Sequence, residues 1–210
     1  MKHKNINPLI FEKTKDGEVI YDIYSRLVKD RIIFLAEEVT ADTATIISAT
    51  LLFLDHQNHD KDISLYINSP GGTVHDGLFT IYDTMQFIKA PVKTVCIGEA
   101  YSAAAVILCA GEKGKRGAFP NANIMIHQVQ IHELDGSGSQ IEKESKRIKK
   151  LNDKIFTTIA RHTGNSVTKV KRDCEEDFFL TSEEALEYGL IDAIVQPQKE
   201  LPELVSRKKK

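Results

Sequence analysis

The sequence contains little cysteine and no long apolar run, and each shortage excludes a class of protein. Cys96, Cys109 and Cys174 are an odd number of cysteines without a C-x-x-C pair, which favours reduced thiols over a disulfide framework. The longest uninterrupted apolar run, residues 103–110, is far shorter than the ~20 residues that a membrane-spanning helix needs. Residues 1–11 include lysines but no apolar segment, unlike a secretory signal. We therefore expect a cytoplasmic protein.

Neither sign of charge is in excess. The 28 lysine and arginine residues nearly balance the 30 aspartate and glutamate residues, so electrostatics give no reason to expect a nucleic-acid or membrane partner. A chain of 210 residues that is 41% hydrophobic and 28% charged has the composition of a soluble globular protein, not of a disordered or collagen-like one. No repeat or shift in composition marks an internal boundary. We expect an N-terminal arm or axial loop over residues 1–20, one domain over 21–196 and a polar tail over 197–210.

Short apolar runs alternate with longer helical patterns through the central part of the chain. Residues 1–20 are polar and irregular, with a turn signal at 15–17. Strands are predicted over residues 31–35, 63–67, 92–97, 123–127 and 191–195. Helices are predicted over residues 43–56, 77–88, 102–110 and 140–162, the last closed by Gly164, and over a short segment from a capping box at Thr181 and Glu184 to Gly189. Strands separated by helices need crossover connections, so the fold class is α/β with a largely parallel sheet.

Ser102 is the first candidate for chemistry. It follows the predicted strand 92–97 and opens the next predicted helix. A turn from strand to helix exposes a hydroxyl beside free backbone N–H groups, which suits the nucleophile of an acyl transfer. The tight G-x-S-x-G spacing is absent, and capping of its own helix is the alternative role for this serine. The local pattern leaves both roles open.

Three further features lie where α/β proteins place their sites. Gly71 and Gly72 follow a predicted strand and allow backbone N–H groups to point into a cleft. His127 ends another predicted strand, and the carboxyl ends of strands commonly carry ligands. Asp177 ends an acidic run before an apolar segment. Each has a purely structural alternative: an ordinary tight turn, a structural histidine and a solvated acidic face.

Six motifs in a fixed order strengthen this interpretation. Together they resemble the proteolytic subunit of the ATP-dependent Clp protease, over about residues 21–195. The resemblance implies a serine peptidase with a crotonase-like α/β fold, built as a single domain with a protruding strand-helix handle. The motifs are YDIYSRL at 21–27, YINSPGG at 66–72, IYDTMQ at 81–86, GKR at 114–116, MIHQ at 125–128 and EYGLID at 187–192.

The resemblance also implies the site residues. Ser102, His127 and Asp177 match the catalytic triad of the family, in which the histidine takes the proton of the attacking serine and the aspartate orients the imidazole. The backbone N–H groups of Gly72 and Ala103 match its oxyanion hole. No metal and no cofactor are expected in this chain.

An assembly and a partner follow from the same resemblance. The family forms two stacked heptameric rings around a closed chamber, so we expect self-association into a homo-oligomeric double-ring tetradecamer. Residues 111–116 lack the spacing and hydroxyl of a phosphate-binding loop, so we expect an AAA+ unfoldase to use ATP and deliver unfolded protein substrates. Phe53, Tyr66 and Phe87 match aromatic positions of the groove that receives the unfoldase, with core packing as their alternative role.

Two departures from the family pattern leave alternatives open. Val129 stands where the family has proline, and Glu175 and Glu176 stand where it pairs an acidic residue with arginine across the two rings. The second change predicts an altered or pH-sensitive contact between rings. An active endopeptidase is favoured because all triad positions are intact, and a weakly active or regulatory ring subunit is the alternative. An acyl-CoA hydratase or isomerase of the crotonase superfamily is disfavoured, because Ser102 and His127 would have no role in it.

Overall fold

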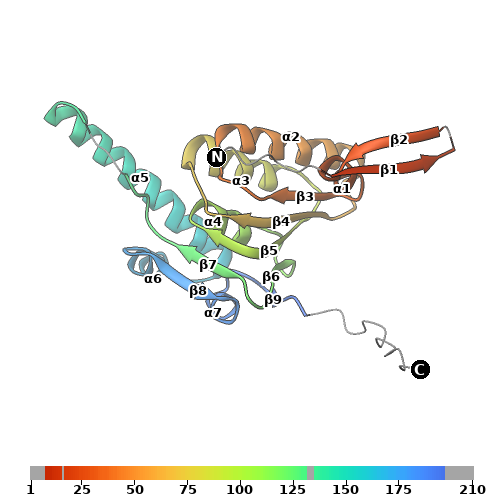
Figure 1. Cartoon of the computed structure of the whole chain (residues 1–210). Helices are drawn as coiled ribbons and strands as arrows, with labels where there is room; N and C mark the ends of the chain where they lie inside the picture. The colour runs from red at the N-terminus through yellow and green to blue at the C-terminus, as the bar shows by residue number, and fades with distance from the viewer. Residues whose placement is uncertain (1–7, 16, 132–134, 197–210) are drawn as a thin grey trace, which may run out of the picture.

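The computed structural model of the chain describes residues 8–15, 17–131 and 135–196. Over these residues, an antiparallel hairpin precedes a seven-stranded sheet with helices packed on it (Figure 1). The strands are β1 (Leu9–Thr14), β2 (Gly17–Asp22), β3 (Ile32–Leu35), β4 (Ile63–Ser69), β5 (Val92–Tyr101), β6 (Arg116–Ala118), β7 (Asn123–Ile126), β8 (Phe178–Thr181) and β9 (Ala193–Ile194). The helices are α1 (Ile23–Lys29), α2 (Ala41–Gln57), α3 (Phe79–Phe87), α4 (Ala103–Cys109), α5 (Gly138–Thr163), α6 (Val167–Asp173) and α7 (Ser182–Tyr188), with a π-helical turn (Val74–Leu78) leading into α3.

The sheet is parallel apart from one pair of strands. Its main path is β3-β4-β5-β6-β9, and every neighbouring pair on this path is parallel. β7 pairs parallel with β5, and β8 pairs antiparallel with β7. The predicted α/β class with a largely parallel sheet is confirmed.

The sheet branches at β5, and this branch positions the site. β4 lies along one edge of β5, while β6 and β7 share the other edge. β6 pairs with Thr94–Cys96 and β7 with Glu99–Tyr101, so β7 lies beside the carboxyl end of β5. Since β8 runs antiparallel to β7, its first residue faces the last residue of β7. The end of β5, the end of β7 and the start of β8 therefore meet at one point.

The core lies between the sheet and the packed faces of the helices. All seven residues of α4 are buried, and their small or branched side chains let this helix pack closely beneath the branch of the sheet. Leu51 and Leu54 of α2 and Leu65 of β4 are completely buried in the same core. Removal of this apolar surface from water is the main favourable term in folding. It holds the turn between β5 and α4 in place.

The helix and strand predictions hold for most of the chain. The predicted capping box at Thr181 and Glu184 begins α7, and Gly164 closes α5 in a left-handed conformation. The predicted helix 77–88 begins instead as the π-helical turn before α3. α1, β6, α6 and β8 were not predicted, because each is seven residues or shorter and lacks a clear apolar period.

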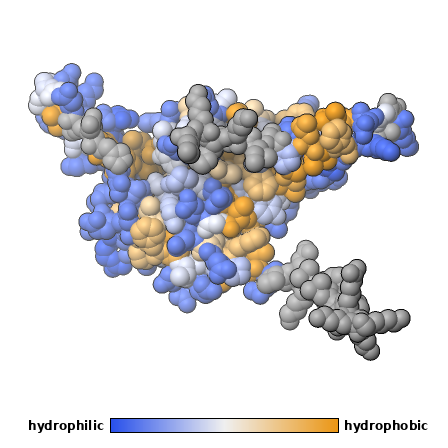
Figure 2. Space-filling model, viewed as in Figure 1, coloured by the Kyte–Doolittle hydropathy of each residue, from blue (hydrophilic) through white to orange (hydrophobic). Residues whose placement is uncertain are grey.

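Within the described part of residues 1–20, the chain forms a hairpin, so the expectation of irregular backbone there is wrong, while its role as an arm or axial loop stays a prediction. β1 and β2 pair antiparallel around the predicted turn, with Lys13 opposite Glu18. Each face mixes apolar and charged residues, which hid the alternation typical of strands. Leu9, Phe11 and Ile20 remain exposed on it, and Figure 2 shows apolar surface gathered where the hairpin joins the body.

The hairpin and α5 project from the body at opposite ends of the molecule (Figure 1). The first half of α5 is largely exposed, whereas Leu151, Ile155 and Ile159 in its second half are buried. The strand-helix handle stays a prediction. Within the described ranges, no helix is long and apolar enough to cross a membrane.

The aromatic residues predicted to line a partner groove lie on α2, β4 and α3. The side chains of Phe53 and Phe87 are 53% and 79% exposed, so core packing does not explain them. Tyr66 is half-buried and stacks on Phe34, with 5.4 Å between ring centroids. Docking of a partner at these residues stays a prediction.

Candidate active site

Ser102 occupies a strained turn between β5 and α4. Its backbone has φ 55° and ψ −121°, a region that residues other than glycine rarely adopt. Its side chain makes no capping hydrogen bond to α4. The alternative role of a helix-capping serine is therefore not what the structure shows, and the hydroxyl is free to face the cleft.

Two contacts hold this turn. Ser102 N donates a hydrogen bond to Met125 O at 2.8 Å, which ties the turn to β7. Gly71 packs directly against it, with φ +94°, and a Cβ on Gly71 would lie 2.7 Å from Ser102 Cβ and 2.5 Å from Tyr101 O. Only glycine accepts both this conformation and this close approach. The predicted glycine turn is therefore part of the support for Ser102.

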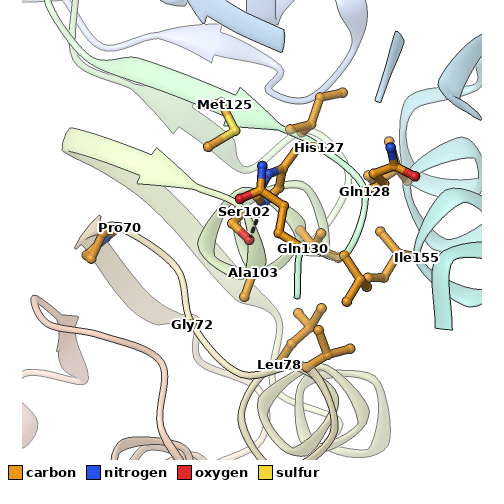
Figure 3. A pocket seen from close by; sticks show the side chains of 15 residues that line it. Pro70, Gly72, Leu78, Ser102, Ala103, Met125, His127, Gln128, Gln130 and Ile155 are labelled. Atoms are coloured by element: carbon orange, nitrogen blue, oxygen red, sulfur yellow. Dashed lines mark hydrogen bonds between the residues drawn. The ribbon is translucent and has the colours of Figure 1, made fainter. Parts of the chain in front are cut away.

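His127 and Asp177 complete one chain of hydrogen bonds with Ser102. His127 Nε2 lies 2.8 Å from Ser102 Oγ (Figure 3). His127 Nδ1 lies 3.0 Å from Asp177 Oδ1. A carboxylate only accepts hydrogen bonds, so Nδ1 carries the proton and Nε2 accepts from the serine hydroxyl. The side chain of His127 is 13% exposed and that of Asp177 is 44% exposed. Asp177 is thus both partly solvated and bonded to His127.

The loop that carries Asp177 is attached to the segment that follows His127. Gln128 N donates to Cys174 O, and Gln128 Nε2 donates to Glu175 O, both at 2.8 Å. These bonds join the two segments just beyond the paired ends of β7 and β8. They set the separation between His127 and Asp177 through the backbone rather than through the side chains alone.

Two backbone N–H groups beside Ser102 have no partner among the described residues. They belong to Gly72 and to Ala103, the first residue of α4. Gly71 O and Thr73 N both bond to Val39, so the N–H of Gly72 points to the opposite side of that segment. An anion at the cleft would find two free donors there, as an oxyanion hole requires.

A pocket of about 230 Å³ opens beside Ser102 and His127 (Figure 3). Its wall includes the apolar side chains of Val74, Leu78 and Ile155 as well as polar groups of the site. A cavity of ~150 Å³ is large enough to hold benzene. The pocket can therefore accept a large apolar side chain next to the hydroxyl.

The cysteines are not alternative nucleophiles. Burial raises the pKa of Cys96 to about 11 and those of Cys109 and Cys174 to about 12. All three thiols are free and buried. Such thiols stay protonated near neutral pH, and the thiolate is the reactive form. Among the described residues, no group of three or more His, Cys, Asp or Glu side chains is placed to hold a metal ion.

Two polar residues at the site were not identified from the sequence. Gln130 Nε2 donates to Asp177 Oδ1 at 3.1 Å, and Asn152 Oδ1 of α5 accepts from Val129 N at 2.7 Å. A glutamine and an asparagine in polar segments carry no signal of function. One signal was present: Val129 replaces the proline of the family pattern, and unlike proline it has an N–H group that can donate to Asn152.

One protein family matches nearly the whole chain. A family model described as Clp protease matches residues 15–198. The matched range contains every residue of the site described above.

Proposed function

Because the chain belongs to the Clp protease family and is therefore a peptidase, we propose that it is a serine endopeptidase subunit with Ser102 as its nucleophile. The observation that carries this proposal is the unbroken series of hydrogen bonds from Ser102 through His127 to Asp177. The strained turn supports it, because it points a hydroxyl into a cleft at the cost of about 1–3 kcal/mol of backbone energy.

In the proposed reaction, Ser102 Oγ attacks the carbonyl carbon of a peptide bond while its proton passes to His127 Nε2. The C–N bond then breaks, and His127 gives this proton to the leaving amine. Water next attacks the acyl-serine, losing a proton to His127, and the ester C–O bond breaks as Ser102 Oγ takes that proton back. Asp177 keeps Nδ1 protonated throughout and stabilises the imidazolium.

The N–H groups of Gly72 and Ala103 are proposed to bind the oxyanion of each tetrahedral intermediate. Among the described residues, neither donor has a hydrogen-bond partner. A backbone donor of this kind stabilises charge that develops only in the transition state, and loss of one donor typically slows the reaction by about 10²–10³.

The pocket beside Ser102 is proposed to receive the side chain before the cleaved bond. Val74, Leu78 and Ile155 in its lining offer no hydrogen-bond partner to a charged group. We expect the substrate backbone to lie extended as an added strand between the segments after Gly72 and after His127. The proposed preference is for a large hydrophobic residue.

We further propose that this subunit works inside the chamber of a double heptameric ring, fed with unfolded polypeptides by an AAA+ unfoldase that uses the ATP. A crotonase-like form of the α/β fold belongs to the same proposal. The projecting α5 is suited to contacts between subunits, since its first half buries few side chains within its own chain. The effect of Glu175 and Glu176 on ring stacking stays a prediction.

Hydrolysis of a short, unstructured, hydrophobic fluorogenic peptide tests the proposed function. Short peptides diffuse into a chamber, so neither ATP nor a partner is needed. We expect the parent to cleave the peptide and Ser102→Ala to lose at least about 10³-fold in kcat, with an unchanged mass by sedimentation. Ser145→Ala is the matched control, because this serine is exposed on α5 and makes no side-chain hydrogen bond in the described structure.

Hydrolysis by Ser102→Ala at the parent rate would exclude Ser102 as the nucleophile. No hydrolysis by either would favour the regulatory ring subunit.

A further inference from the structure

The carboxylate of Asp177 has a second hydrogen-bond donor besides His127. Gln130 Nε2 lies 3.1 Å from Asp177 Oδ1, the same oxygen that accepts from His127 Nδ1 at 3.0 Å. Since a carboxylate only accepts, the amide nitrogen must be the group that faces it. Figure 3 shows Gln130 beside His127 and Ser102 at the mouth of the pocket.

Gln130 extends from a segment that is held on two sides. Val129 N donates to Asn152 Oδ1 of α5, and the backbone and amide of Gln128 donate to the loop that carries Asp177. Gln130 therefore does not sample the site from a free loop. The hydrogen bonds of Gln128 and Val129 position the backbone of Gln130 independently of its own side-chain contact.

Asp177 needs such support more than a buried carboxylate would. Its side chain is 44% exposed, and His127 and Gln130 are its only side-chain hydrogen-bond partners among the described residues. With His127 alone, the carboxylate could rotate toward water and release the imidazole. A second donor on the same oxygen limits this rotation, and hydrogen bonds to charged groups are stronger than those between neutral groups.

We propose that Gln130 is a positioning residue of the Ser102, His127 and Asp177 triad, acting by holding Asp177 Oδ1 against His127 Nδ1. This inference rests on the proposed function. Gln130 takes no part in bond making or breaking. It keeps the imidazole in the tautomer and orientation in which Nε2 can accept the proton of Ser102.

Two substitutions of similar shape test this role by peptide hydrolysis. Gln130→Met removes the donor, and we expect kcat to fall about tenfold with KM changed less than twofold. Gln130→Glu replaces the donor with a carboxylate that faces Asp177, so we expect at least the same loss at neutral pH. Gln57→Met is the control, since Gln57 is exposed at the end of α2 and its side chain makes no hydrogen bond within the described residues.

The pH dependence separates a hydrogen bond from simple packing. The titratable groups at this contact are His127 and Asp177, with Glu175 and Glu176 on the same loop as Asp177, while α5 presents the neutral Asn152. In the Gln130→Glu variant, the introduced carboxyl can again donate to Asp177 once it is protonated, because two adjacent carboxylates share a proton readily. The ratio of Gln130→Glu activity to parent activity should therefore rise toward acidic pH, and the ratio for Gln130→Met should stay flat.

The outcomes distinguish this inference from the proposed function. The role of Gln130 is overturned if Gln130→Met has the kcat of the parent, or if the ratio of Gln130→Glu activity to parent activity does not change with pH. If Ser102→Ala is inactive in the same assay, the proposed function still stands. If the parent hydrolyses no peptide, the rate at which a fluorophosphonate labels Ser102 replaces kcat as the measurement. A parent that is neither active nor labelled overturns the proposed function and this inference together. Thermal unfolding of each variant, expected to match the parent, identifies any loss due to folding.

Discussion

At the scale of single residues, the site depends on backbone conformations that most residues avoid. Ser102 has φ 55°, and the two glycines before the π-helical turn, Gly71 and Gly72, have φ +94° and +152°. The strain at Ser102 persists because the burial of all of α4 and the bond to Met125 O leave the turn no alternative. This strained conformation directs the hydroxyl of Ser102 toward His127.

Gly71→Ala should damage both stability and activity. The added Cβ would lie 2.7 Å from Ser102 Cβ and 2.5 Å from Tyr101 O, at a φ unfavourable for alanine. We expect a loss of about 2 kcal/mol in the free energy of unfolding and a fall in kcat of at least about 10². Chemical denaturation and peptide hydrolysis measure the two effects.

Gly138→Ala is the matched control for this substitution. Gly138 begins α5, and a Cβ there would meet nothing within 4 Å. We expect parent activity and equal or slightly greater stability, because alanine favours helix. Equal behaviour of the two variants would contradict the close packing of Gly71 against Ser102.

At the scale of secondary structure elements, α5 has two halves with different surroundings. Its second half packs into the core through residues such as Leu151 and Ile155, and its first half projects from the body (Figure 1). Asn152 lies at the junction and bonds to Val129 N at 2.7 Å. This hydrogen bond connects α5 to the segment between His127 and Gln130.

Asn152→Leu should destabilise the protein by leaving the half-buried N–H of Val129 without a partner. The expected loss is about 1–3 kcal/mol, measured by chemical denaturation. Proline at position 129 has no N–H to leave unpaired, and the Clp family resemblance places proline there. The double variant Asn152→Leu with Val129→Pro should therefore be more stable than Asn152→Leu alone. Effects that simply add in the double variant would show that this bond does not couple the two residues.

At the scale of the whole molecule, one buried ion pair joins segments that are distant in sequence. The side chain of Arg116 on β6 is 1% exposed and bonds to Asp192, to Cys109 O at the end of α4 and to His162 O near the end of α5. Arg116 therefore connects β6 with the C-terminal ends of α4 and α5. Burial raises the pKa of Asp192, but the hydrogen bonds and charge of Arg116 outweigh burial and hold that pKa well below its ordinary value.

Asp192→Asn should lower the free energy of unfolding by about 3 kcal/mol at neutral pH, because it leaves a buried charge unpaired. A depressed carboxyl pKa contributes stability above the ordinary value of about 3.9 and loses it as the pH falls toward the folded-state pKa. The difference between parent and variant should therefore be constant near neutrality and shrink below about pH 4. Chemical denaturation across this range measures it. Asp60→Asn, at a side chain that is 88% exposed, should show no such difference.

The sequence by itself determined most of the local elements and indicated the family. Helix caps depend on bonds between close neighbours in the sequence, as at Gly164 and in the capping box of Thr181 and Glu184. Most of the parallel strands were predicted from their apolar periodicity. The order of the motifs was sufficient to suggest the family that the match over residues 15–198 shows. The hairpin was missed because its two faces mix charged and apolar residues.

Only the tertiary structure decided which of these residues meet. Ser102 and His127 are 25 positions apart, and His127 and Asp177 are 50 apart, so no local pattern relates them. They converge because β7 pairs with the second half of β5 and β8 returns antiparallel to β7. The contact of Gln130 with Asp177 arises from the same geometry, since two polar side chains acquire a joint role only when folding places a donor within reach of an acceptor.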